Sequence, residues 1–237
     1  MEAKTDHDEA LNTLQAALGI TFRDAMLLRR ALVHSSYVNE NPGCEYGDNE
    51  RLEFLGDAVG DLIAAEYLYE RFPTWPEGEL TALRASLVRS ETLALFAAQV
   101  GLGQHLWLGR GEEKGGGRVR AGLLGDAFEA LLAALYLDQG LEVTRRFLRP
   151  LLESETNALV AGDQGLNAKG RLQEWAQGTL QATPGYHTVE ESGPDHAKFF
   201  TVEVWVHGQV LARGEGRSKQ AAEEAAAKAA LVANSVT

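Results

Sequence analysis

Two segments of the chain carry carboxylate side chains at helical spacing. These side chains are Glu50, Glu53 and Asp57 in the first segment and Asp126 and Glu129 in the second. On a helix, each set would share one face. Carboxylates gathered on two neighbouring helices supply the oxygen ligands that a hard divalent cation such as Mg²⁺ prefers. The spacing therefore raises the hypothesis of a metal site with coordination positions left for phosphate.

An acidic stripe is also typical of a helix face that simply contacts water. In the first segment this alternative stays open, because Asp61 extends the stripe by another turn. In the second segment the acidic side is flanked by small residues, Gly122, Ala130 and Ala133, where a solvated face more often carries Lys or Gln. Small residues allow a second helix or a phosphate to approach closely. The two segments together favour a Mg²⁺ site, which Mn²⁺ could also occupy.

The elements that must position these residues are helices. Apolar residues recur at three- and four-residue spacing from about residue 10 to residue 159, which predicts an all-α region. Two of the predicted helices, over 51–71 and 122–137, carry the carboxylates. The buried face of the first helix is predicted to consist of Leu52, Leu55, Val59, Leu62 and Ile63.

A different pattern begins after residues 161–165, whose composition is typical of a linker. The predicted elements are a helix over 169–177, strands over 186–191, 200–206 and 209–213, and an Ala-rich helix over 219–233. His207 and Gly208 are expected to form the tight turn between the last two strands. The chain is therefore predicted to be multidomain, with an all-α domain followed by a small α+β (α-β-β-β-α) domain.

The acidic segment 49–57, Asn-Glu-Arg-Leu-Glu-Phe-Leu-Gly-Asp, resembles the signature of the ribonuclease III family. Residues 31–37 and 125–130 resemble the blocks that flank this signature, in the family's order. The C-terminal part resembles a double-stranded-RNA-binding domain over residues 172–174, 193–196 and 214–219. The resemblance implies an all-α endonuclease domain over 1–158, a linker over 159–167 and a double-stranded-RNA-binding domain over 168–237.

The resemblance also assigns roles to the acidic residues. It implies that catalytic Mg²⁺ is bound by Glu53, Asp57, Asp126 and Glu129, with Glu50 an acidic member of the same site. It makes Glu77 an acid that reaches the catalytic valley of a partner subunit, although from the sequence alone Glu77 equally fits an exposed loop carboxylate. The expected reaction is hydrolysis of double-stranded RNA by water activated at the metal. It would leave 5′-phosphate and 3′-hydroxyl ends in the processing of ribosomal and messenger RNA.

Phe54 lies nearer the carboxylate face than the apolar face of its predicted helix. An exposed ring beside an active site indicates an interface, although a partly buried surface Phe is the alternative. The resemblance implies that two nuclease domains pair symmetrically and that Phe54 packs into the partner. A homodimer of this kind would carry two acidic sites, one for each strand of a duplex.

The C-terminal domain is expected to grip duplex RNA by its shape, through 2′-hydroxyl groups and phosphates. The candidate RNA-binding residues are Gln173, Gln177, His196, Arg217, Ser218 and Lys219. The last three lie at the start of a predicted helix, where the backbone N–H groups favour phosphate. Taken singly, each residue also fits solvated surface, and Ser218 fits a helix cap.

The chain's charge argues against nucleic-acid binding, because 22 Lys and Arg face 34 Asp and Glu. Its single cysteine, Cys44, and its lack of a long apolar run favour a cytoplasmic protein without membrane association. The Gly-rich segment 109–117 lacks the spacing of a nucleotide-binding loop, so no nucleotide cofactor is expected. This segment is predicted to be a mobile loop whose neighbouring Lys114, Arg118 and Arg120 approach the RNA backbone.

Two other functions compete with a dimeric, Mg²⁺-dependent endoribonuclease. A duplex-RNA-binding protein whose helical domain only dimerises is disfavoured by the complete carboxylate set. An acidic helical scaffold that binds no RNA leaves the C-terminal pattern unexplained. His34, beside Ser35 and Ser36, could suggest a nucleophile with its base, but adjacent helical residues face different ways, so packing or capping is the better interpretation.

Overall fold

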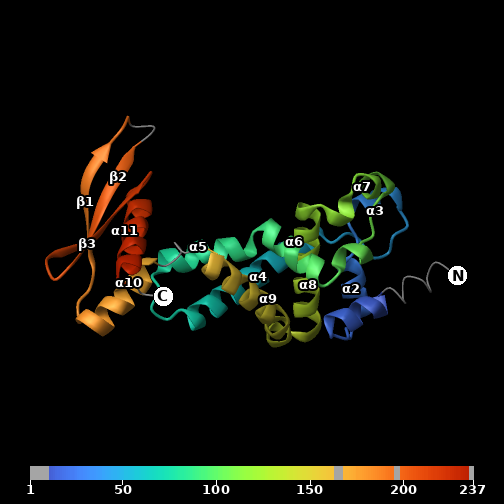
Figure 1. Ribbon diagram of the computed structural model, residues 1–237. Helices are drawn as coiled ribbons and strands as arrows, with labels where there is room; N and C mark the ends of the chain where they lie inside the picture. The colour runs from blue at the N-terminus through green and yellow to red at the C-terminus, as the bar shows by residue number, and fades with distance from the viewer. Residues whose placement is uncertain (1–10, 163–167, 195–197, 235–237) are drawn as a thin grey trace. The chain divides into compact units, whose positions relative to one another are not determined.

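The structure is a computed structural model that describes residues 11–162, 168–194 and 198–234 (Figure 1). The chain forms two compact units. One contains the chain up to Phe72 together with Leu80–Thr156, and the other contains Pro73–Glu79 and the chain from Asn157 onward. Among the described residues, no helix is both long enough and apolar enough to cross a membrane.

The first part of the chain is helical, as predicted. Residues 11–18 are helical and are followed by α2 (Ala25–Ala31), α3 (Ser35–Glu40), α4 (Glu50–Arg71), α5 (Glu77–Val88), α6 (Ser90–Gln99), η1 (Leu102–His105), α7 (Arg110–Lys114), η2 (Gly117–Val119), α8 (Ala121–Gln139) and α9 (Leu141–Gly162). The segment Ala161–Gly162, expected to begin a linker, forms the last residues of α9.

Helix α8 lies at the centre of the first unit and packs against α2, α4 and α6 (Figure 1). Its sequence is rich in Ala and Leu, which are strong helix formers. Most of its residues between Leu123 and Leu135 are buried, on every side of the helix. The helix stops at Gly140, whose φ of 82° lies in the region that favours glycine.

The buried face of α4 differs in part from the prediction. Leu52, Val59 and Ile63 are buried as predicted, but Leu62 is 47% exposed. The buried face also includes Gly56 and Gly60, which place the packing stripe closer to the carboxylates than the apolar pattern indicated. The predicted buried face was based on the spacing of large apolar residues. It therefore missed a helix contact that is made through glycine.

The second unit has the predicted α-β-β-β-α order. It consists of α10 (Ala168–Trp175), η3 (Ala176–Leu180), β1 (Gly185–Ser192), β2 (Phe199–Val206), β3 (Gln209–Gly216) and α11 (Lys219–Ala233). The three strands form an antiparallel sheet in the order β1-β2-β3. The predicted turn is confirmed at His207 and Gly208, which both have positive φ.

Helix α11 packs on the sheet and α10 packs against α11, and both helices contribute to the core of the unit. The core includes Leu172 of α10, Val202 and Val204 of β2, and Leu231 of α11. Gly214 brings β3 against α11, since a Cβ atom there would lie 2.0 Å from the backbone nitrogen of Ala226. The Ala-rich sequence of α11 therefore allows a close helix–sheet contact.

One helix of this unit does not have the predicted form. A regular helix was expected over Lys169–Gln177, but α10 ends at Trp175 and the chain continues as a π-helical turn to Leu180. Gln177 lies in this turn and not on α10. Gly178 and Thr179, which disfavour a regular helix, lie in the same turn.

Candidate active site

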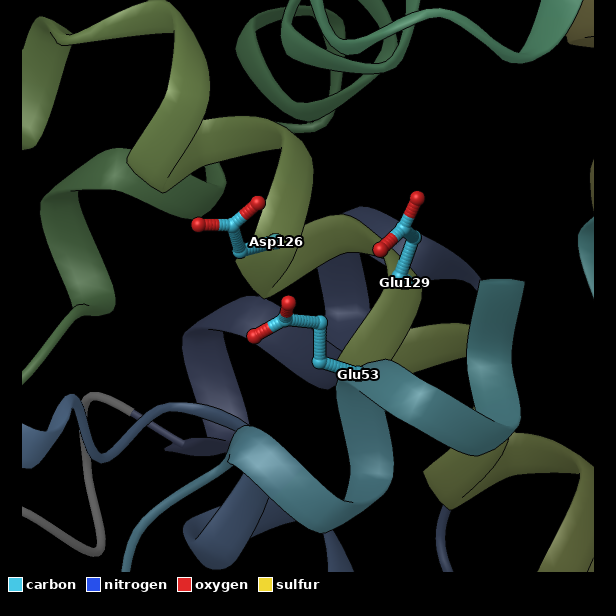
Figure 2. A group of neighbouring side chains, drawn as sticks. All are labelled: Glu53, Asp126 and Glu129. Atoms are coloured by element: carbon cyan, nitrogen blue, oxygen red, sulfur yellow. The ribbon is translucent and has the colours of Figure 1, made fainter.

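The two acidic segments meet where α4 crosses α8. Glu53 of α4 and Asp126 and Glu129 of α8 each offer a carboxylate oxygen, and these oxygens all lie within 4.8 Å of one another. Figure 2 shows the three side chains gathered where the two helices lie side by side. Glu53 precedes Asp126 by 73 positions and Glu129 by 76 positions in the sequence, yet the three residues form one group of ligands.

The crossing depends on a close backbone contact. A Cβ atom on Gly56 would stand 1.8 Å from the carbonyl oxygen of Glu129 and 2.9 Å from its Cα. Only glycine allows the helices to approach this closely. Gly122, whose small size suggested such a contact, faces open space instead, while Gly125 packs against the backbone of Ser90 in α6.

Glu129 is the most strongly perturbed of the carboxyl groups. Its pKa is raised from the ordinary 4.5 to about 8, first by burial and then by the charges of Asp57, Asp126, Glu53 and Asp61. Burial disfavours the charged form, and nearby negative charges add to that effect. Without a cation, Glu129 therefore tends to hold a proton near neutral pH.

The other two members of the group show the same trend. Burial raises the pKa of Glu53, and the carboxylates of Asp126, Glu50 and Asp57 raise it further. Burial also raises the pKa of Asp126, whereas the nearby His34 side chain lowers it. Carboxyl groups with raised pKa values in one place mark a candidate functional site.

Three further carboxylates of α4 lie near this group. Asp57 and Glu50 are exposed on α4, and both lie close enough to raise the pKa of Glu53. Asp61, expected to belong to a solvated face, also raises the pKa of Glu129 and forms an ion pair with Arg84 at 3.8 Å. Glu77 is exposed at the first residue of α5.

The donor set fits a hard divalent cation. All three grouped ligands are carboxylate oxygens, and neither a thiolate nor an imidazole is among them. Oxygen-only ligands suit Mg²⁺ and Mn²⁺ better than softer metals. A cation would also relieve the repulsion that, after burial, raises the pKa of Glu53 and Glu129. The group is therefore able to hold a metal ion.

Asn49, which the sequence analysis left without a role, fixes the start of α4. It is 3% exposed, its backbone N–H donates to the Val33 carbonyl at 2.9 Å, and its side-chain amide donates to the Ala31 carbonyl at 3.3 Å. The first turn of α4, with Glu50 and Glu53, is thereby attached to the segment before α3. In the sequence, the position of Asn49 directly before the acidic helix was the feature that could have indicated this role.

The Gly-rich segment was expected to be a loop, but the structure shows helical turns there. It contains α7 and η2, and Arg118 is part of its framework. The Arg118 guanidinium donates to the carbonyls of Gly103, Gln104 and Leu106 at 3.0, 3.2 and 2.9 Å. Arg118 also pairs with Glu113 and Arg120 with Glu112, each at 2.6 Å. These two arginines neutralise local carboxylates, which argues against the expected RNA contact.

Phe54 lies on α4 next to Glu53, and its side chain is 82% exposed. The predicted exposure is therefore confirmed. Tyr69 on the same helix is 76% exposed. Large exposed apolar side chains on one helix are typical of an interaction surface.

The candidate RNA-binding residues lie mainly at the surface of the second unit. Gln173 and Gln177 are exposed on α10 and the π-helical turn, and Arg217 is exposed between β3 and α11. The Ser218 hydroxyl caps α11 by accepting from the backbone N–H of Ala221 at 3.1 Å, as predicted. Lys219 pairs with Glu191 at 2.8 Å. His196 lies outside the described residues.

Comparison with known proteins gives the same organisation. Residues 24–155 match the ribonuclease-III-like family, and residues 168–232 match the double-stranded RNA binding motif. The chain is 50% identical over 225 residues to ribonuclease 3 of Roseiflexus sp. (strain RS-1), covering 94% of this chain and 95% of that protein. It is 49% identical over 224 residues to ribonuclease 3 of Desulforamulus reducens, covering 94% and 91%.

A solved structure agrees. The nuclease domain of ribonuclease III from Campylobacter jejuni, described for structural flexibility in a region involved in dimer formation, is 38% identical, with a TM-score of 0.55. The matched region covers 60% of this chain and 95% of the Campylobacter jejuni chain. The motifs of the sequence agree with the two matched family models, with the relatives of nearly full length and with the shared helical fold. The chain belongs to the ribonuclease III family.

Proposed function

We propose that the protein is an endoribonuclease that cleaves double-stranded RNA by Mg²⁺-dependent hydrolysis of phosphodiester bonds. The observation that carries this proposal is the meeting of the Glu53, Asp126 and Glu129 carboxylates within 4.8 Å in a chain of this family. The products would carry 5′-phosphate and 3′-hydroxyl ends. Processing of ribosomal and messenger RNA is the role that fits such an activity.

In this proposal Glu53, Asp126 and Glu129 hold Mg²⁺, and Asp57 completes the ligand set from the next turn of α4. Glu50 adds negative charge beside Glu53, and Glu77 is a further acidic residue of the catalytic valley. Mn²⁺ suits the same oxygen donors. When bound, the cation neutralises phosphate charge and lowers the pKa of water, so that water becomes a nucleophile near neutral pH.

The protein's own residues set the conditions for this chemistry. The close contact of Gly56 with Glu129 fixes the distance between the α4 and α8 ligands. The partly buried carboxylates repel each other, so the site favours a cation over its empty state. A set of carboxylate oxygens at this spacing would therefore favour a small divalent ion.

We assign duplex recognition to the second unit, within proposed boundaries of 1–158 for the nuclease domain, 159–167 for the linker and 168–237 for the RNA-binding domain. Gln173 and Gln177, whose side chains are exposed, would exchange hydrogen bonds with 2′-hydroxyl groups. Arg217, Ser218 and Lys219 surround the N-terminus of α11, where the helix dipole favours phosphate. His196 completes the set from the β1–β2 connection.

We also propose that the active form is a homodimer. The ring of Phe54 is 82% exposed beside the carboxylates, and burying it in a partner would remove a large apolar surface from water. The similar Campylobacter jejuni domain has a region involved in dimer formation. Two symmetric sites would then be available for the two strands of one duplex.

The test compares cleavage and binding of a long RNA duplex. We expect the wild-type protein to cut the duplex with Mg²⁺ and not with EDTA. Glu129→Gln and Asp126→Asn should each abolish cleavage while the affinity for the duplex stays within about twofold. Glu70→Gln is the matched control, because Glu70 lies on α4 and only forms a surface ion pair with Arg149.

Two results would contradict the proposal. Cleavage retained in both Glu129→Gln and Asp126→Asn would remove the acidic group from the mechanism. Duplex binding by the wild-type protein without Mg²⁺-dependent cleavage would favour the alternative, a duplex-RNA-binding protein whose helical domain only dimerises.

A further inference from the structure

Lys219, the first residue of α11, contacts two residues of the sheet. Its ammonium nitrogen Nζ lies 2.8 Å from a carboxylate oxygen of Glu191 on β1 and 5.6 Å from the centre of the Phe200 ring on β2. Glu191 and Phe200 are partners across the β1–β2 pair. The ammonium group therefore already has an anionic partner and an aromatic partner inside the second unit.

The ion pair between Glu191 and Lys219 lies at the surface. The side chain of Lys219 is 58% exposed and that of Glu191 is 45% exposed, so an anion from solution can reach both. The hydrogen bond from Lys219, together with the charges of Lys219 and Lys198, holds the pKa of Glu191 below its ordinary value. Glu191 is therefore ionised at neutral pH and remains a full anionic partner for Lys219.

The same end of α11 is where the proposed function places a phosphate of the RNA. Ser218 caps this end, and the N–H groups of a first helical turn favour an anion. Gln220 and the two alanines that follow bring no charge, so Lys219 is the one charged side chain among residues 219–222. Glu191 thus neutralises the side chain on which phosphate binding at this turn depends.

We propose that Glu191 competes with RNA phosphate for Lys219 and thereby lowers the affinity of the second unit for duplex RNA. A phosphate oxygen takes the place of the carboxylate oxygen on Nζ, and the displaced carboxylate stays beside the phosphate and repels it. Binding exchanges one ion pair for another, where an unpaired lysine would gain a new one. This inference rests on the proposed function, since it requires Lys219 to contact RNA.

The exchange should change both the affinity and its dependence on salt. Exposed ion pairs are weak, so removing the competitor should tighten binding by about three- to fivefold. A lysine that neutralises a phosphate contributes about 0.9 to the slope of log K against log salt on duplex DNA, because counterions are released. When Lys219 leaves Glu191, the freed carboxylate takes up a cation from solution, which offsets part of that release.

The experiment measures binding of a labelled RNA duplex to the full chain in EDTA over a series of salt concentrations. Glu191→Gln removes the charge and keeps the shape of the side chain. We expect it to bind about three- to fivefold more tightly at low salt, with a slope steeper by up to about 0.9. In cleavage assays with Mg²⁺, its KM should fall while the single-turnover rate at saturating enzyme stays unchanged.

Glu190→Gln is the matched control. It makes the same change in charge at the preceding position of β1, where Glu190 is exposed and is the partner of Thr201. Successive side chains of a strand point to opposite faces of the sheet, so Glu190 does not share the face of Glu191. Glu190→Gln should therefore leave the affinity and the salt slope close to the wild-type values.

A double-mutant cycle shows whether the effect passes through Lys219. In a Lys219→Gln background, Glu191→Gln should lose most of its gain in affinity, because the competition needs both partners. A full gain in that background would mean that Glu191 only repels RNA, and it would overturn the competition.

The other outcomes are distinguishable. Unchanged or weaker duplex binding by Glu191→Gln would overturn the inference, and weaker binding would indicate that Glu191 holds Lys219 ready for phosphate. Failure of the folded wild-type protein to bind the duplex at all would instead contradict the proposed function. Melting temperatures of the variants should stay within about 3 °C of the wild-type value, since the substituted side chains are exposed.

Discussion

Gly56 of α4 lies directly against the main chain of Glu129 in α8, so that a Cβ atom on Gly56 would stand 1.8 Å from the Glu129 carbonyl oxygen. This contact sets the distance between the two helices at the level of the acidic group. Because Glu53 lies one turn before Gly56, the same contact brings Glu53 to the carboxylates of α8. The distance between the ligands of the two helices therefore depends on Gly56, a residue that has no side chain.

Gly56→Ala should destabilise the protein and weaken metal binding together. The added methyl group meets backbone atoms, which cannot rotate away, so the helices must separate; overpacking of this kind costs about 1–3 kcal/mol or more. Chemical denaturation and Mn²⁺ titration measure the two effects. Gly122→Ala on α8 is the control, since its Cβ would meet nothing within 4 Å and should leave stability unchanged or slightly higher. Equal stability of the two variants would contradict the role of Gly56.

Glu129→Gln should stabilise the metal-free protein more at high pH than at low pH. The pKa of Glu129 is raised to about 8 in the folded protein from the ordinary 4.5, so the folded state binds more protons between these pH values. Stability from this group is complete below pH 4.5 and is lost as the pH rises through about 8. After discounting for partial exposure, we expect a gain on the order of 1–2 kcal/mol at high pH.

Denaturation of both proteins in EDTA at about pH 5 and pH 8.5 measures this difference. Glu70→Gln serves as the control, because Glu70 forms only a surface ion pair with Arg149. A constant stability difference between Glu129→Gln and the wild-type protein at both pH values would show that Glu129 has an ordinary pKa.

Phe54→Ala should weaken the dimer without affecting the fold of the protomer. The ring is 82% exposed in the single chain, so its removal leaves no cavity. Loss of a buried aromatic anchor from an interface costs about 2 kcal/mol or more, which corresponds to at least a roughly 30-fold weaker dimer. Sedimentation across a concentration series measures the change. Val119→Ala, at a position 76% exposed, is the control. A Phe54→Ala protein that stays fully dimeric at micromolar concentration would contradict the interface.

Arg217→Ala should weaken duplex RNA binding and make it less dependent on salt. Each neutralised phosphate contributes about 0.9 to the slope of log K against log salt on duplex DNA, so losing one contact lowers the slope by about 1. Lys228→Ala is the control, since Lys228 is exposed further along α11. Lys219 already pairs with Glu191 at 2.8 Å, and Gln220 brings no charge, so the wild-type slope itself should be shallow. A steep wild-type slope, or an unchanged slope in Arg217→Ala, would contradict this assignment.

Much of the fold and part of the site could be predicted from the sequence. The helices, the three strands and the turn at His207-Gly208 are encoded by local periodicity and turn chemistry, which depend on residues close together in the chain. The i, i+3 spacing placed Asp126 and Glu129 on one face of α8 for the same reason. The exposure of Phe54 and the cap at Ser218 also followed from local position.

Only the tertiary structure decided which of these local features meet. Periodicity could not show that α4 and α8 cross at Gly56, because a missing side chain leaves no apolar signal. The raised pKa of Glu129 arises from burial and from charged side chains of α4, which lie far from Glu129 in the sequence. Within a helix, spacing follows from the backbone's own hydrogen bonds, whereas the distance between helices depends on side-chain size at the crossing. The sequence by itself determined the ligands on each helix, and the packing of the helices determined that they form one site.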